Sequence, residues 1–224
     1  MNKRDTSPST VHIFSVGDFG QAVAARLKAQ RSEVIETVVM NDTVPIPGVW
    51  PDSRVTVIAG WRPNPNLCEL LEEFSYQRQR PFVPLFQVSG ALRLGPVVVP
   101  GEGPCWSCWM RRFKQHAEWS EAETALLDHY ARQPESGPRG FLEPFAVMAA
   151  ARLSHTIQQL LDQEPIAGQI WQIHMLTREI TKSLVIGMHG CPRCGLNRAA
   201  PARTFVRMHE ELAHLWDSAS GEGD

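Results

Sequence analysis

The sequence predicts an α/β fold whose doubly wound, largely parallel sheet carries helices on both faces. Near-continuous apolar runs occur at residues 11–16, 54–59 and 82–88, as expected for strands buried on two sides. Segments with helical apolar spacing lie between these runs, so strands and helices alternate along the chain. With 224 residues, 43% of them hydrophobic, the chain is long enough for one large domain or two small ones.

The first half of the chain supplies most of the predicted sheet. Its polar first ten residues are expected to form a flexible tail. Each following segment is assigned from its apolar period and its turn residues. The assignments are a strand at 11–16, a glycine turn at 17–20, a helix at 21–30, strands at 33–40 and 54–59, a helix at 67–74, and a strand at 82–88.

The second half adds shorter strands and further helices. Two short strands are predicted at 91–93 and 96–99, then a surface excursion at 111–140 that holds one helix and a mobile loop. A long core-facing helix at 145–161 precedes a strand pair at 170–176 and 181–186. We therefore expect one α/β domain over residues 11–198, closed by a β-hairpin, and a C-terminal helix and tail over 199–224.

Composition excludes several classes of protein. A formal net charge of -2 gives no electrostatic basis for nucleic-acid binding. No stretch reaches the roughly 18 apolar residues of a membrane span, and the N-terminus lacks the apolar core of a signal peptide. A cytoplasmic location is therefore expected, and in a reducing compartment paired cysteines more often bind metal or do redox chemistry than form disulfides.

Two Cys-x-x-Cys pairs are the most specific chemical feature. Cys105 and Cys108 form one pair, and Cys191 and Cys194 form the other. Two intervening residues let a turn aim both thiolates at one tetrahedral ion, so each pair supplies half of a zinc site. Four thiolates close the coordination sphere, and the predicted zinc is therefore structural rather than catalytic.

Other interpretations of these cysteines are compatible with the sequence. A redox dithiol or an iron–sulfur site would use the same residue type, although a redox pair normally starts a helix and needs no second pair. Unligated thiols are the third reading. Trp106 and Trp109 beside the first pair are expected to cover the thiolates, and Cys68, on a predicted helix, is expected to be a core thiol.

The glycine turn after the first strand is a weak candidate for nucleotide binding. Gly17 and Gly20 stand between a strand and a helix, where nucleotide phosphates bind in a Rossmann-like domain. Asp18 and Phe19 interrupt the usual glycine pattern, so a turn kept for packing is the alternative. No Ser–His–Asp or Cys–His arrangement is recognisable, and no catalytic residue is predicted.

The motifs together resemble a known superfamily. The glycine turn, the sheet strands and the two cysteine pairs, in that order, resemble those of the ThiF/MoeB-like, ubiquitin-activating-type proteins. The closer resemblance is to the ThiF-like partner proteins of YcaO cyclodehydratases, and its specific match is the segment 94–108, which reads LGPVVVPGEGPCWSC, with the segment 190–195, GCPRCG. It covers roughly residues 11–198 and implies a nucleotide-binding-type α/β domain with a late four-cysteine zinc site.

The chain departs from the adenylating members in two places. Their acidic residue after the second strand has only Asp42 as a counterpart here. Gly60, Trp61 and Arg62 follow the third strand where those enzymes place an Asp for ATP and magnesium. The resemblance therefore makes ATP binding doubtful.

The resemblance implies a partner role in the modification of ribosomal peptides. We expect a zinc-stabilised, non-catalytic subunit that docks onto a YcaO enzyme, which forms thiazole or oxazole rings at Cys, Ser or Thr. Because the first strand begins near residue 11, the precursor peptide is expected to be held directly or through a separate leader-binding protein. A homodimer stays open. The alternatives are an active ATP-dependent adenylating enzyme acting on a peptide or carrier-protein C-terminus, and a zinc-stapled binding domain outside any peptide pathway.

Overall fold

The computed structural model describes residues 10–40, 43, 50–88, 90–116, 120–133, 136 and 140–195. Its centre is one seven-stranded sheet with the strand order β2-β1-β3-β4-β5-β6-β7. The predicted α/β class is confirmed. The predicted flexible tail at 1–10, apart from residue 10, the residue Asp42 and the C-terminal segment 199–224 lie outside the described residues.

Twelve elements make up the described part of the chain. They are β1 (Val11–Val16), α1 (Gly17–Gln30), β2 (Val34–Val39), β3 (Val55–Gly60), α2 (Pro65–Gln77), β4 (Phe82–Val88), β5 (Ala91–Leu94), α3 (Trp106–His116), α4 (Ser120–Arg132), α5 (Glu143–Leu161), β6 (Gln169–His174) and β7 (Ile180–Leu184).

The sheet is mixed rather than parallel throughout. β1 pairs in parallel with both β2 and β3, and β3 pairs in parallel with β4. The next three pairings, β4 with β5, β5 with β6 and β6 with β7, are antiparallel. The predicted hairpin near the end of the domain is therefore present as β6 and β7.

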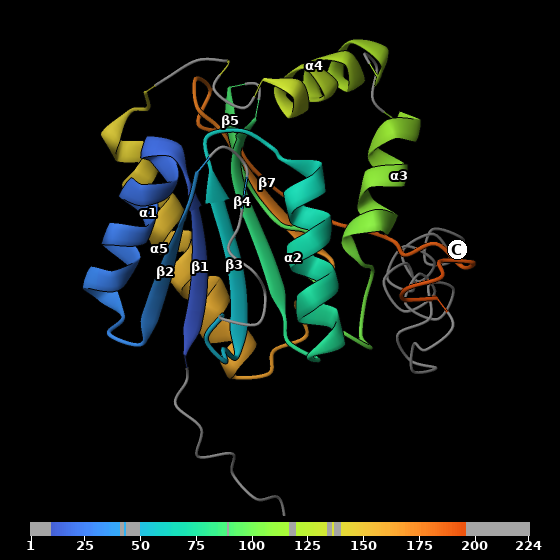
Figure 1. Ribbon diagram of the computed structural model, residues 1–224, viewed down its shortest axis with the longest axis horizontal. Coiled ribbons are helices and arrows are strands. Elements are labelled where there is room, and N and C mark those ends of the chain that lie inside the picture. The colour runs from blue at the N-terminus through green and yellow to red at the C-terminus, as the bar shows by residue number, and fades with distance from the viewer. Residues whose placement is uncertain are drawn as a thin grey trace, which may run out of the picture.

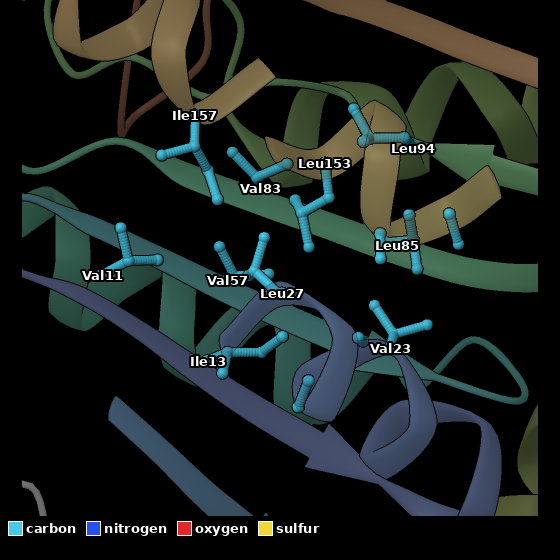
Figure 2. Packing of buried hydrophobic residues seen from close by; sticks show 14 of the residues in the cluster. Val11, Ile13, Val23, Leu27, Val57, Val83, Leu85, Leu94, Leu153 and Ile157 are labelled. Carbon is cyan, nitrogen blue, oxygen red and sulfur yellow. The ribbon is translucent and has the colours of Figure 1, made fainter. Parts of the chain in front are cut away.

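Helices cover both faces of this sheet (Figure 1). On one face, α1 and α5 pack on the sheet through a cluster of buried aliphatic side chains that includes Val23, Leu27 and Leu153 (Figure 2). On the other face, α2 and α3 close a second cluster that is richer in aromatic residues. Ile13 belongs to the first cluster and Phe14 to the second, because successive residues of a strand point to opposite faces.

The structure corrects the predicted start of the first helix. α1 begins at Gly17 rather than at Gln21, so residues 17–20 form its first turn and not a separate loop. Gly20 is held close to the sheet: a Cβ added there would stand 2.3 Å from the carbonyl oxygen of Ala59. The glycine therefore lets α1 approach β3 closely at its first turn.

The predicted strand at 96–99 is also wrong. Only an isolated bridge between Phe82 and Val98 forms there. Pro96 and Pro100 bound the segment, and a proline nitrogen cannot donate to a ladder.

The region 111–140, set apart by its sequence as a surface excursion, begins inside α3. Phe113 packs against the second core cluster, and Arg112 Nε donates to the carbonyl oxygen of Ile186 at 2.5 Å. Beyond this, α4 lies across the end of the sheet at which β3 ends (Figure 1). Tyr130 of α4 meets Trp61, which directly follows β3, with ring centroids 5.8 Å apart. Most of the predicted loop at 133–140 lies outside the described residues.

His12, buried in β1, predicts how stability depends on pH. Its Nε2 lies 2.8 Å from Thr37 Oγ1, and burial lowers its pKa from 6.5 to about 4. Between these values the unfolded chain binds a proton that the native chain does not, so the contribution of His12 to the free energy of unfolding falls as pH drops. The full shift corresponds to about 3 kcal/mol. Urea unfolding of the parent and of His12→Asn between neutral pH and about pH 4.5 isolates this contribution, and the parent should lose stability relative to the variant as pH drops. A difference between the two proteins that does not change with pH would contradict this assignment.

Within the described part of the chain, none of the helices combines the length and apolar character needed to cross a membrane.

Candidate metal centre

Four cysteine sulfurs from distant parts of the chain converge on one point. The sulfur ligand atoms of Cys105, Cys108, Cys191 and Cys194 all lie within 4.8 Å of one another. The separations are 3.8 Å between Cys105 and Cys108, 3.5 Å between Cys105 and Cys191, and 3.4 Å between Cys108 and Cys194. Sulfurs at 2.3 Å from a tetrahedral zinc ion stand about 3.8 Å apart, so small adjustments would complete such a site.

The first pair lies at the start of a helix, which differs from the predicted turn. Cys105 immediately precedes α3, its carbonyl oxygen accepts from the Trp109 N–H at 3.3 Å, and Cys108 lies in the first helical turn. One helical turn brings residues i and i+3 to the same side, so both sulfurs point the same way. A redox dithiol is often placed at a helix start, but here the second pair completes a four-sulfur cluster.

The second pair forms the predicted tight turn. The Cys191 N–H donates to the Met188 carbonyl oxygen at 3.2 Å, and the Gly195 N–H donates to the Cys191 carbonyl oxygen at 2.8 Å. A Cβ added at Gly195 would stand 2.5 Å from that same carbonyl oxygen. Glycine at this position therefore lets the chain fold back tightly enough to present both thiols.

The cluster is buried, and its sulfurs contact one another. All four cysteines are at most 3% exposed. Hydrogen bonds from Cys105 and Cys194, together with one from the Met188 N–H at 3.4 Å, hold the pKa of Cys108 well below that of an ordinary thiol. The geometry therefore favours at least one thiolate, which is the form that binds metal.

Tyr76 and Met188, rather than the expected tryptophans, pack against the cysteines. The prediction that Trp106 and Trp109 cover the thiolates is wrong. Both indoles belong to the aromatic core cluster on the α2 and α3 face, with ring centroids 4.6 Å apart. Each tryptophan comes directly after a cysteine in the sequence, but its side chain points from α3 to the sheet. Cys68 is fully buried on α2, as predicted for a core thiol.

This donor set fits a structural metal ion. Four cysteine sulfurs that can surround one ion tetrahedrally are suitable ligands for zinc or for an iron centre. They leave no coordination position open for a substrate or a reactive water. A metal bound here would join the start of α3 to the turn after β7, residues 86 positions apart in sequence. Zinc as the ion stays a proposal.

An ion pair ties the second cysteine pair to α2. Arg193, between Cys191 and Cys194, donates to Glu72, whose side chain is fully buried. Glu69 and Glu73 lie further from the same guanidinium, at 3.9 and 3.7 Å, and are largely exposed. Burial raises the pKa of Glu72 to about 7, although Arg193 acts in the opposite direction. The guanidinium is thus the chief compensation for a carboxylate placed inside the protein.

The role of Glu72 was not predicted, although the sequence contains a signal for it. Glu72 follows the buried Cys68 by four residues, which places it on the same face of α2. An acidic residue on the apolar side of a helix requires a partner. The partner itself, 121 residues away, could not be identified from local pattern.

The predicted nucleotide position at Gly17 and Gly20 is covered by a side chain. A Cβ added at Gly17 would stand 2.5 Å from Cδ1 of Trp61, so the indole lies directly over the start of α1. Asp18 adds a negative charge in the first helical turn. A phosphate bound at this helix start would have to displace the indole, so the residues present do not fit it. Nucleotide binding at these glycines stays a prediction that this geometry does not favour.

Several solved structures share the fold of this chain over most of its length. The heterocyclase TruD aligns with a TM-score of 0.59 and 20% identity, covering 84% of this chain and 27% of that one. The E. coli microcin synthetase McbBCD complex aligns with a TM-score of 0.58 and 16% identity, covering 85% of this chain and 71% of its own. E. coli MccB with ATP aligns with a TM-score of 0.57 and 16% identity, covering 84% and 67%.

The chain has a ThiF-like fold. This confirms at the level of fold the resemblance carried by the two cysteine motifs. At these identities the ThiF-like fold is all that the likeness shows. The chain spans only about a quarter of the length of the two heterocyclase chains, 27% and 25%. No protein-family profile matches the sequence, and no curated protein matches it.

Proposed function

We propose that this chain is a zinc-stabilised, non-catalytic ThiF-like subunit that works with a YcaO-type cyclodehydratase on a ribosomal peptide. The observation that carries the proposal is the fold likeness to the heterocyclase TruD and to the microcin synthetase complex, over 84% and 85% of this chain. The four buried cysteines support the zinc part of the proposal because they supply the expected ligands.

The proposal divides the work between this chain and its partner. We propose that the YcaO-type partner supplies ring formation. In that reaction a Cys, Ser or Thr side chain attacks the preceding backbone carbonyl carbon. The partner transfers phosphate from ATP to the carbonyl oxygen, which then leaves as phosphate. In this proposal the chain contributes a folded scaffold and a docking surface for the partner, and no catalytic group.

Two features support a non-catalytic role for the chain itself. Trp61 lies over the start of α1, where a nucleotide phosphate would otherwise bind. A four-thiolate metal site has no open coordination position. We propose that the region 111–140 binds the partner, because binding residues more often lie on surface segments at the end of a sheet than in the core.

Several finer points belong to the same proposal. The precursor peptide is held directly or through a separate leader-binding protein, and the complex works in the cytoplasm. A homodimer is compatible with this role.

Reconstitution tests the proposal directly. A YcaO-type protein recovered with this chain from the native host would be purified and incubated with ATP and the precursor peptide, with and without the chain. We expect a mass loss of one water per ring that depends strongly on the chain. Recovery of no YcaO-type protein, or an equal rate of water loss without the chain, would count against the partner role.

The alternative function is an active adenylating enzyme. The likeness to MccB, which was solved with ATP, favours it at the level of fold. Calorimetry of the isolated chain with ATP and magnesium separates the two functions. We expect no measurable heat of binding, whereas tight magnesium-dependent binding would reject the non-catalytic role.

A further inference from the structure

The strand β7 forms one open edge of the sheet. It is the last strand in the sheet order, and β6 is its pairing partner. Four of its five residues, from Ile180 to Ser183, are exposed. Within the part of the chain that the structure describes, no strand pairs with its outer side. An edge strand of this kind offers unpaired backbone N–H and C=O groups to another extended chain.

Hydrogen bonds at both ends of the β6–β7 pair fix the direction in which each backbone group points. The His174 N–H donates to the Glu179 carbonyl oxygen at 2.9 Å, and the Val185 N–H donates to the Gly168 carbonyl oxygen at 2.9 Å. In an antiparallel pair, opposite residues that exchange hydrogen bonds alternate with opposite residues that do not. The odd-numbered residues of β7 are therefore bonded to β6, and the even-numbered ones direct their backbone groups to the open edge.

Three residues of β7, Ile180, Lys182 and Leu184, thus present their N–H and C=O groups at this edge. Because they occupy every second position, their side chains share one face of the sheet. It is the face on which α1 and α5 pack, since Lys182 lies opposite Trp171, which packs against the cluster on that face. Ile180 is 59% exposed. The edge therefore combines free backbone groups with a row of side chains in the order apolar, cationic, apolar.

The charge beside this edge is positive. Arg152 of α5 places its guanidinium carbon 5.8 Å from the ring centroid of Trp171, the residue opposite the exposed Lys182. In the described part of the chain neither cation forms an ion pair. Arg178 and Glu179, in the turn before β7, carry opposite charges and offset each other. The remaining surplus favours a ligand with negative charge.

A second copy of β7 is a poor partner for the same edge. Lys182 is the middle residue of the strand, so antiparallel pairing of two copies about this position would place two lysines directly opposite each other. Like charges directly opposite destabilise a strand pair. A lysine in an edge strand commonly prevents self-association for this reason. The same lysine attracts a carboxylate at the opposing position.

We propose that β7 binds an extended acidic segment of a partner polypeptide, which adds to the sheet as a further antiparallel strand. The antiparallel direction continues the half of the sheet that β4 to β7 form. A Glu or Asp of the segment lies opposite Lys182, and apolar residues two positions before and after it lie opposite Leu184 and Ile180. Main-chain hydrogen bonds supply affinity, and the acidic residue supplies specificity. The site is independent of the YcaO partnership, because the isolated chain is expected to bind the segment.

Titration of the isolated, metal-loaded chain with short peptides tests this edge. The probe is acetyl-Ser-Val-Thr-Glu-Thr-Val-Ser-amide. One control has Lys in place of Glu, and the other carries a methyl group on the Glu nitrogen, which removes the N–H that would donate to the Lys182 carbonyl oxygen. Binding is followed by NMR shifts and hydrogen exchange of the backbone amides of Ile180, Lys182 and Leu184. We expect the probe to slow exchange of these three amides and both controls to bind more weakly. No binding of the probe, or equal binding of the methylated peptide, overturns the proposal.

The same three amides also report on other occupants of the edge. In the free protein they should exchange rapidly, whereas the amides of Thr181 and Ser183, which are bonded to β6, should be protected. Protection of the three outward amides without peptide would overturn the proposal. Protection that rises with protein concentration would assign the edge to a second copy, and protection independent of concentration would assign it to another segment of this chain.

Charge reversal separates a specific strand pair from a general charge effect. Lys182→Glu should weaken binding of the Glu probe about fivefold to tenfold and make the Lys peptide the better ligand. Arg111→Glu makes the same change of charge at an exposed position of α3, which packs on the opposite face of the sheet. It should leave both affinities unchanged. Equal weakening by Lys182→Glu and Arg111→Glu would refute the site.

Discussion

Replacement of Cys191 by serine is expected to abolish metal binding and to cause the largest loss of stability from any single change considered. The cluster needs all four sulfurs to close a tetrahedral site, and Cys191 Sγ lies 3.5 Å from Cys105 Sγ. Structural zinc sites in finger peptides contribute roughly 10–16 kcal/mol of binding free energy, so we expect a loss of at least about 4 kcal/mol here. Elemental analysis measures metal per chain, and urea unfolding measures the free energy of unfolding.

Cys68→Ala is the matched control for that experiment. Cys68 is equally buried but belongs to the core cluster of α2, so its removal should leave metal content at one ion per chain. The expected loss of stability is about 1–2 kcal/mol, as for other small core truncations. Unchanged metal content in Cys191→Ser, or well under one ion per chain in the parent protein, would contradict the metal site. Elemental analysis also distinguishes zinc from iron.

Substitution of Arg193 by methionine is expected to produce the second large effect. Glu72 would keep its fully buried position without the guanidinium that compensates its charge. Removal of one partner from a buried ion pair costs about 3–5 kcal/mol, and we expect the lower end because Arg193 is itself 21% exposed. Urea unfolding with the metal present in excess measures this cost separately from metal loss.

Two further variants test the interpretation. Glu73→Gln removes an exposed carboxylate 3.7 Å from the same guanidinium, and we expect a change within about 0.5 kcal/mol. The double variant Glu72→Leu with Arg193→Met should recover much of the stability lost in the single one, because no buried charge remains. If Arg193→Met costs no more than Glu73→Gln, the ion pair has no structural role.

The strands were predictable because burial leaves a simple mark on the sequence. The runs in β1 and β3 are mainly apolar, as expected for a strand covered on both faces, and all six residues of each are buried. The cysteine pairs were equally informative, since spacing alone indicated one cluster and the structure brings the four sulfurs together. That they bind zinc remains a proposal.

The errors have a common physical origin. Sequence neighbours such as Cys105 and Trp106 point in different directions from the start of one helix, so proximity along the chain did not show what covers the thiols. The position of Trp61 over Gly17 depends on how the loop after β3 meets α1, which no local period records. The pairing of Glu72 with Arg193 likewise joins positions 121 residues apart.

The position of α4 suggests that the length of the chain around this helix can change without disturbing the sheet. The helix lies within a stretch whose two ends, at Cys108 and Cys194, meet with their sulfurs 3.4 Å apart. A doubling of the length of a closed loop costs only about 0.6 kcal/mol in chain entropy. Insertions or deletions around α4 would thus leave both ends of the stretch anchored at the same point. Changes in the length of this region would therefore alter the surface beyond the end of the sheet and leave the sheet itself in place.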